Sequence, residues 1–330
     1  MGALISLLAV VALVAIALVG TGVASLEVLF GVVVPYAALA IFIVGLVYRV
    51  LTWARSPVPF RIPVTCGQQK SHPWIRSNYF DNPHTTLGVI GRMALEVLLF
   101  RSLFRNTKVE LRDGPRLAYE WEKWLWLAGL AFHWSFLVVL VRHLRFFLEP
   151  VPFAITALEG LDGFFQIGLP ALYLTDAVLL AAVSYLFIRR VAIPQIRYIS
   201  LPADYFPLFL IFALALSGVL MRYYIRVDVE KVKELAMGLA TFRPQVPAGI
   251  GSLFYVHLFL VSILFAYFPF SKLMHLGGVF LSPTRNMANN NRMRRHVNPW
   301  DYPVKVHTYE EYEDEFRDRM RAAGLPLEKE

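Results

Sequence analysis

Four histidines lie in two apolar stretches of the sequence, and a neutral imidazole is the commonest metal ligand in proteins. His133 and His143 are ten positions apart in the stretch 131–147, and His257 and His275 are eighteen positions apart in the stretch 255–278. An ionisable side chain in a membrane-spanning helix is costly and usually has a functional partner. Two such pairs therefore predict a binding site that is repeated along two helices.

Two antiparallel helices with two imidazoles each can hold two flat cofactors stacked across a bilayer. Haem b fits this arrangement, because its iron accepts one axial ligand from each side of the ring. We therefore predict two haem b groups, with His133, His143, His257 and His275 as axial and metal ligands. For a single histidine, a core residue bonded to a neighbouring helix would be an equally good interpretation. The other four histidines, at 72, 84, 296 and 307, fall in polar segments and are interpreted as surface residues.

Loop charges define the pairing. They predict that the first of these helices runs outward and the second inward, so His143 should meet His257 near the outer face and His133 should meet His275 near the cytoplasm. Eighteen residues of ideal helix span about 27 Å and return to one face, whereas ten span about 15 Å and turn by about 80°. Straight helices cannot match both pairs. We expect Pro269 to kink the second helix, and if one pair fails to meet, we expect it to be the inner one.

The composition indicates an all-α, polytopic membrane protein. Of 330 residues, 57% are hydrophobic and only 17% are charged, and the mean hydropathy is +0.53, far from a typical soluble domain. The net charge of +8 is better explained by basic loops held in the cytoplasm than by nucleic-acid binding. We expect the inner (cytoplasmic) membrane as the location.

Cys66 is the single cysteine. One cysteine excludes an internal disulfide, covalent haem attachment through CxxCH and a cysteine-ligated iron–sulfur cluster within this chain. Any cluster must therefore belong to a partner.

Six apolar runs are long enough to cross about 30 Å of hydrocarbon. They cover 3–24, 28–50, 122–148, 167–188, 205–224 and 251–275. No Lys or Arg precedes Arg49, so we expect the first run to be a retained helix rather than a signal peptide. The alternation of basic and non-basic loops predicts both termini in the cytoplasm.

This topology divides the chain into four parts. They are two N-terminal membrane helices (1–53), a basic cytoplasmic segment (54–120), a four-helix di-haem core (121–275) and a cytoplasmic tail (276–330). Within the second part, residues 88–105 are predicted to form a helix too short and too arginine-rich to span the bilayer. Residues 149–166 and 227–250 are expected to be outer loops.

Several charged residues flank the outer histidines. Arg142, Arg145 and Arg222 could bind haem propionates or a quinone, or extend to the membrane interface. Asp162 and Gln166 are candidates for the quinone site, together with Arg142 and His143. Asp176 is placed inside the fourth span, where an ion pair with an arginine is favoured over a role in proton transfer. No catalytic residue is predicted.

The spacing of the four histidines resembles that of the gamma subunit of respiratory nitrate reductase, a di-haem b membrane subunit that oxidises quinol. The stretch TCGQQKSHPWIRSNYFDNPHTTLGVIGRMALEVLLFRSLFRNT (65–107) and the additional first span look more like the DsrM family, also described as HmeC. That family is the cytochrome b subunit of the DsrMKJOP complex.

The DsrM resemblance implies a menaquinone-linked subunit that exchanges electrons with a cytoplasmic iron–sulfur partner of the heterodisulfide-reductase type (DsrK) in sulfite reduction. It also implies membrane and extracytoplasmic partners of the DsrJ, DsrO and DsrP types. Two other functions stay open from the residues themselves: a proton-coupled transporter and a non-redox anchor for a multisubunit complex.

Overall fold

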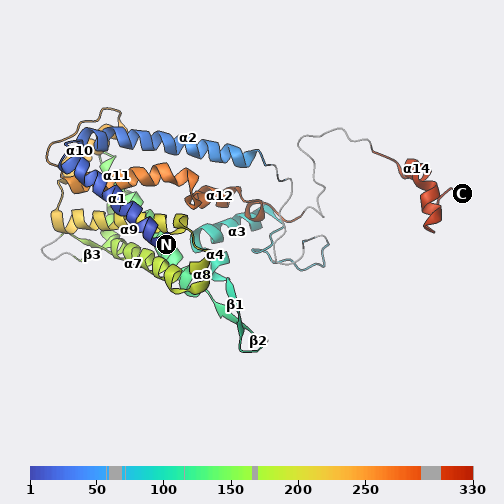
Figure 1. Cartoon of the computed structure of the whole chain (residues 1–330). Coiled ribbons are helices and arrows are strands. Elements are labelled where there is room, and N and C mark those ends of the chain that lie inside the picture. The colour runs from blue at the N-terminus through green and yellow to red at the C-terminus, as the bar shows by residue number, and fades with distance from the viewer. Residues whose placement is uncertain are drawn as a thin grey trace.

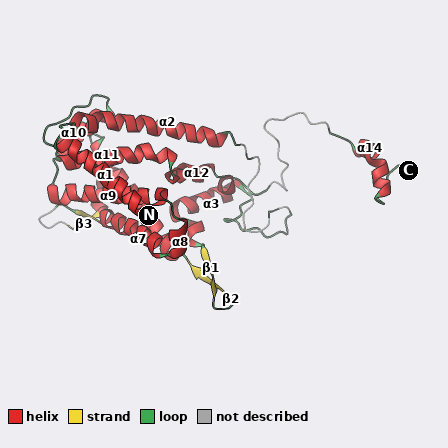
Figure 2. Cartoon of the chain, viewed as in Figure 1, coloured by secondary structure: helices red, strands yellow, loops and turns green. Residues whose placement is uncertain are grey.

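A computed structural model describes the chain except for residues 57, 59–68, 71, 115, 166–169, 291–305 and 330. Cys66, Gln166 and His296 are outside the described residues. Most of the rest is helical (Figure 2), in agreement with the all-α fold class.

An elongated helical bundle forms the body of the molecule (Figure 1). Its long helices are α1 (Gly2–Gly22), α2 (Val34–Ala54), α5 (Lys123–His143), α7 (Leu174–Ala192), α9 (Pro202–Val219) and α11 (Ser252–Tyr267). Single π-helical turns, η1 (Leu29–Val33) and η3 (Leu220–Ile225), extend α2 and α9. Along the bundle, α5 packs on α7, α7 on α9, and α9 on α1 and α11, while α11 also contacts α2.

Five of these helices are long and apolar enough to cross a membrane within the described part of the chain, so this is a multi-pass membrane protein. The remaining predicted span, 167–188, corresponds to α7, which packs in the bundle between α5 and α9 but carries Asp176, Arg189 and Arg190. This helix begins at Leu174 rather than at the predicted residue 167. Asp176 consequently lies in its first turn, not deep in the span as the sequence analysis placed it.

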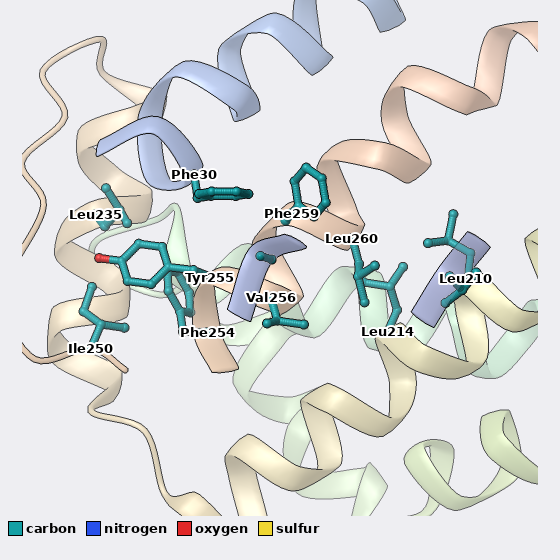
Figure 3. Close-up of a cluster of buried hydrophobic side chains, with 12 residues drawn as sticks. Phe30, Leu210, Leu214, Leu235, Ile250, Phe254, Tyr255, Val256, Phe259 and Leu260 are labelled. Carbon is teal, nitrogen blue, oxygen red and sulfur yellow. The ribbon is translucent and has the colours of Figure 1, made fainter. Parts of the chain in front are cut away.

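The hydrophobic core lies where α1, α9 and α11 meet η1 and α10 (Val229–Ala240) (Figure 3). Leu210, Leu235 and Leu260 are fully buried there, and the ring of Phe30 meets that of Phe259 edge-on at 5.2 Å between centroids. These helices hold α11 on one side, whereas α5 packs mainly on α7. The helix α5, which carries His133 and His143, and the helix α11, which carries His257, therefore belong to different packing groups.

The segment after α11 is broken rather than bent. A 3₁₀ turn, η4 (Phe268–Phe270), ends at Ser271 in an extended conformation (φ −117°, ψ 177°). A second 3₁₀ turn, η5 (Lys272–Met274), then leads into α12 (His275–Leu281). Pro269 lacks the N–H that a continuous helix needs at this position, so the predicted kink is a full break, and His275 begins a new helix.

The basic segment contains more structure than the sequence analysis predicted. The expected helix over 88–105 is divided into α3 (Thr86–Leu99) and α4 (Arg101–Phe104) by Phe100, which has a left-handed backbone conformation. An unpredicted antiparallel hairpin follows, formed by β1 (Thr107–Arg112) and β2 (Arg116–Trp121), with Thr107 opposite Trp121. Glu122 after the hairpin is buried and pairs with Lys108 at 3.0 Å and Arg189 at 2.9 Å.

Shorter elements complete the described chain. They are α6 (Phe153–Asp162), α8 (Pro194–Ile199), α13 (Pro283–Asn286), α14 (Tyr309–Ala322), β3 (Gly163–Phe165) and β4 (Leu172–Tyr173). The two segments expected to be outer loops thus contain the helices α6 and α10. At the other end, α13 docks on α3 through an ion pair of 2.7 Å between Arg285 and Glu96.

Candidate cofactor-binding site

His143 and His257 face each other across α5 and α11, and we call them the outer pair. Their ring centroids are 6.2 Å apart, and their planes differ by only 10°. His143 is the last residue of α5, and His257 lies in the second turn of α11.

His133 and His275 form a second facing pair, the inner pair. Their ring centroids are 5.8 Å apart, and the ring planes are crossed at 78°. Phe100 and Phe132 meet the His133 ring edge-on, at 4.9 and 5.0 Å between centroids. The structure thus brings together the same two pairs that the loop charges predict, including the one expected to be harder to form.

Each of the four imidazoles has its Nδ1 atom engaged in a hydrogen bond. His133 and His143 donate to the carbonyls of Gly129 and Val139, one turn earlier in α5, at 2.7 Å. His275 donates to the Lys272 carbonyl at 2.8 Å.

His257 differs in that its Nδ1 partner is a side chain, the hydroxyl of Ser217, at 2.8 Å. That hydroxyl donates to the Leu214 carbonyl, so its oxygen accepts a hydrogen bond from the imidazole N–H. A histidine that binds a metal commonly donates its second ring N–H to a carbonyl or another oxygen, which fixes the tautomer and the ring orientation. In all four residues this arrangement leaves Nε2 as the atom for coordination.

The two pairs fit haem iron. A bond of about 2 Å between metal and nitrogen on each side, and about 1 Å from nitrogen to ring centre, would place two axial imidazole centroids about 6 Å apart. Both observed separations are close to this value. The donor set also fits, because two neutral nitrogens per site suit a haem iron.

A buried polar cluster lies beside the outer pair. Arg142 is next to His143 in sequence, and its guanidinium pairs with Asp176 at 2.5 Å and with Asp162 at 3.2 Å. Thr175 supports Asp162 through its backbone N–H and its hydroxyl. Asp176 therefore has an arginine as its partner, the alternative that the sequence analysis favoured. Because two carboxylates already hold Arg142, this residue is poorly placed to bind a further anion.

The ring of Tyr173 contacts two guanidinium groups in the same cluster. The Cζ atoms of Arg142 and Arg222 are 3.7 and 4.1 Å from the centre of its ring, so both arginines make cation–π contacts with it. Tyr223 donates from its hydroxyl to Asp176 at 3.3 Å. Sequence reasoning did not identify Ser217, Tyr173 or Tyr223, and only Ser217, a polar residue within an apolar span, carried a signal that could have done so.

The other predicted residues differ in their availability. Arg145 is paired with Glu159 at 2.9 Å. Arg222 donates from Nη2 to the Ala171 carbonyl, but its Nε is buried and has no hydrogen-bond partner among the described residues. Gln166 falls outside the described residues, so its predicted place in a quinone site stays a prediction.

Comparison with known proteins agrees with this architecture. Residues 94–295 match the model of the nitrate reductase gamma subunit family. A protein of Archaeoglobus fulgidus described as "Hdr-like menaquinol oxidoreductase cytochrome b-like subunit" is 49% identical over 281 residues, which cover 83% of this chain and 84% of the relative. A protein of Archaeoglobus profundus with the same description is 44% identical over 274 residues, 81% of each chain.

The matched region includes both histidine pairs and begins within α3. With 202 of 330 residues matched, the chain belongs to the nitrate reductase gamma subunit family. Its relatives bear the name of a cytochrome b-like subunit of a menaquinol oxidoreductase.

Proposed function

We propose that this chain is a di-haem b membrane subunit that transfers electrons between the menaquinone pool and a cytoplasmic partner. The observation that supports this function most directly is the presence of two facing histidine pairs. In each pair the Nδ1 atoms are hydrogen-bonded, and the ring centroids are 5.8 or 6.2 Å apart, close to the separation expected for two imidazoles on one haem iron. Family membership and the names of the two relatives support a quinone-linked electron-transfer role.

The residues of the chain divide the work. His143 and His257 would hold the outer haem, and His133 and His275 the inner one. When bound, haem supplies reversible one-electron chemistry. The protein fixes each imidazole by its Nδ1 hydrogen bond, and the surroundings tune the potential of each site.

We place the quinone site beside the outer pair. The buried cluster of Arg142, Asp162 and Asp176 ends at the hydroxyl of Tyr223, and Arg222 has a buried Nε with no partner in the described chain. Arg222 is therefore better placed than Arg142 or Arg145 to bind a propionate or a quinone oxygen.

The cytoplasmic partner is proposed to be an iron–sulfur protein of the heterodisulfide-reductase type, such as DsrK, because Cys66 alone cannot support a cluster in this chain. Membrane and extracytoplasmic subunits of the DsrJ, DsrO and DsrP types complete the proposed complex, with a role in sulfur metabolism. The four-part division of the chain and its location in the cytoplasmic membrane belong to the same proposal.

An absorption spectrum of the purified protein tests this function. Reduction with dithionite should produce b-type bands, and a pyridine haemochrome assay should give about two haems per chain. Menaquinol should reduce these haems. A colourless preparation would rule the function out and favour a transporter or an anchor.

A further inference from the structure

A stripe of side chains on α2 faces the broken end of α11. Phe42, Arg49 and Trp53 are spaced by seven and four residues, so they lie on one face of the helix. The Phe42 ring is 5.4 Å from Phe265 and 5.7 Å from Phe268, between centroids. Trp53, at the end of the stripe, reaches α12, where a Cβ added to Gly278 would lie 3.6 Å from its ring.

Between these contacts, α2 touches the break itself. A Cβ added to Gly45 would lie 2.7 Å from Cβ of Pro269 and 3.0 Å from the Phe270 ring. Only glycine permits this approach of α2 to η4. Arg49 is one turn after Gly45 and one turn before Trp53 on α2. Because Gly45 contacts Phe270 and Trp53 contacts Gly278, Arg49 lies alongside the segment between Phe270 and Gly278. This segment contains His275.

Arg49 has an unsatisfied group at this position. Its Nε is buried and has no hydrogen-bond partner in the described part of the chain. Leaving a buried polar group unpaired costs free energy, and more so when the group is charged. Two carboxylates near this end of the bundle have other partners, since Asp204 pairs with Lys272 at 2.5 Å and Glu96 pairs with Arg285 at 2.7 Å.

We propose that Arg49 binds a propionate of the haem held by His133 and His275. The inference rests on the proposed function, because it requires a haem at the inner pair. A guanidinium matches the geometry of a carboxylate and forms short, charge-assisted hydrogen bonds with it. A lipid phosphate shares this chemistry, and the experiment below distinguishes the two sources.

Arg49 lies outside the region matched by the family model, which begins at residue 94. The additional N-terminal helices would therefore supply a cofactor contact to a site whose ligands lie within the matched region. In this view, α2 completes the inner site rather than serving only as an additional membrane anchor.

The test uses the full-length purified protein with the variants Arg49→Gln and Arg49→Lys. Arg55→Gln is the matched control, because Arg55 is an exposed arginine directly after α2. The readouts are haems per chain, the midpoint potential of each haem by redox titration, and phospholipid phosphorus per chain. The midpoint potential is informative because loss of a positive charge beside a haem favours the oxidised state of that haem and so lowers its midpoint potential.

We expect Arg49→Gln to retain two haems and to lower the midpoint potential of the inner haem only, or to lose the inner haem alone. Arg49→Lys should remain closer to the wild-type potential, and Arg55→Gln should match it.

Unchanged potentials in Arg49→Gln would overturn the proposal, and a simultaneous loss of bound phospholipid would assign Arg49 to a lipid headgroup. Loss of both haems in both Arg49 variants would assign the residue to folding and also overturn it. Absence of haem from the wild-type protein would instead refute the proposed function.

Discussion

The outer and inner histidine pairs have similar ring separations but are built in different ways. The outer pair joins residues of two regular helices, with near-parallel rings 6.2 Å apart. The inner pair depends on a chain break, because His275 starts a new helix after two 3₁₀ turns, and its ring is crossed with that of His133 at 78°. Helix geometry alone can place one pair, but the unequal spacings of ten and eighteen require an interruption to place the second.

Substitution of a ligand should have the largest effect and should show whether the pairs are independent. We expect His143→Ala to lose the outer haem only and to retain about one haem per chain, because the inner pair keeps both imidazoles. Haem content per chain measures this. His307→Ala is the control, since His307 is exposed and its ring lies 3.9 Å from Glu315. Two haems in His143→Ala would show that the ligand assignment is wrong.

Removal of the break should affect the inner pair alone. In Pro269→Ala the backbone N–H returns, so α11 can continue through 268–274 and carry His275 away from His133. We expect loss of most of the inner haem with the outer haem retained, as measured by haem content and by the number of components in a redox titration. An unaltered inner haem would mean that packing against Gly45, rather than the proline, maintains the break.

The hydrogen bond from His257 to Ser217 offers a finer test, because it is the only one of the four Nδ1 contacts made by a side chain. Loss of such an outer contact typically lowers metal affinity by roughly 10- to 100-fold. We expect Ser217→Ala to weaken haem retention at the outer site by a factor in this range and to leave the inner haem unchanged. Ser262→Ala is the matched control, since Ser262 is also buried but donates to the Leu258 carbonyl. Equal haem loss in both variants would indicate a general packing defect.

Ring orientation should distinguish the two sites without any substitution. Axial imidazoles with parallel planes split the iron d orbitals more than crossed ones do, so the two oxidised haems should give different low-spin EPR signals. We expect the more anisotropic signal, with the larger maximum g value, from the inner site. The His143→Ala variant, which lacks an outer ligand, should retain the more anisotropic signal. If that signal disappears instead, it belongs to the outer site.

The smallest expected effect concerns the segment that supports the inner pair. Asp81 accepts hydrogen bonds from Arg101 and Arg105 of the α4 region, next to Phe100, which contacts His133. Burial opposes ionisation of Asp81, but the hydrogen bonds and charges of Arg105 and Arg101 hold its pKa below the ordinary value. The pKa of Asp81 is thus lower in the folded state than in the unfolded state. Ionised Asp81 therefore contributes to the stability of the fold above about pH 4, and this contribution is lost as the pH falls through the folded-state pKa.

Because these side chains are partly exposed, Asp81→Asn should destabilise α3 and α4 by only about 0–1 kcal/mol. Hydrogen exchange in α3 and α4 at neutral pH should increase slightly in this variant, and acidification below pH 4 should reduce the difference from the wild type. Exchange near the outer pair should not change. A difference that grew on acidification would contradict the sign of the pKa shift.

The composition and the length of the apolar runs predicted the helical class and located the long helices, because runs such as 3–24 and 205–224 have few alternatives in a membrane. Local backbone choices were harder to predict. Phe100 adopts a left-handed conformation that its side chain does not indicate, so one expected helix is two. The hairpin at 107–121 could have been predicted, because Val109 and Leu111 alternate with charged residues before the turn and Leu117, Tyr119 and Trp121 alternate in the same way after it. It was missed because the whole basic segment was interpreted as a polar connection. Asp176 was placed too deep in the span because the start of α7 was not evident from the local sequence. Near this start, Asp176 contacts Arg142 and Tyr223, which lie in distant parts of the chain.

The Nδ1 hydrogen bonds have an evolutionary consequence. Three of them end on the main-chain oxygens of Gly129, Val139 and Lys272, which every residue type supplies. Substitutions at these positions can therefore accumulate without loss of the contact, whereas Ser217 can be replaced only by another residue that offers an oxygen or by a different support for His257. Among descendants of one ancestor, the four histidines and the single supporting hydroxyl should therefore be retained. The residues whose main-chain carbonyls support the other three histidines should vary freely in type.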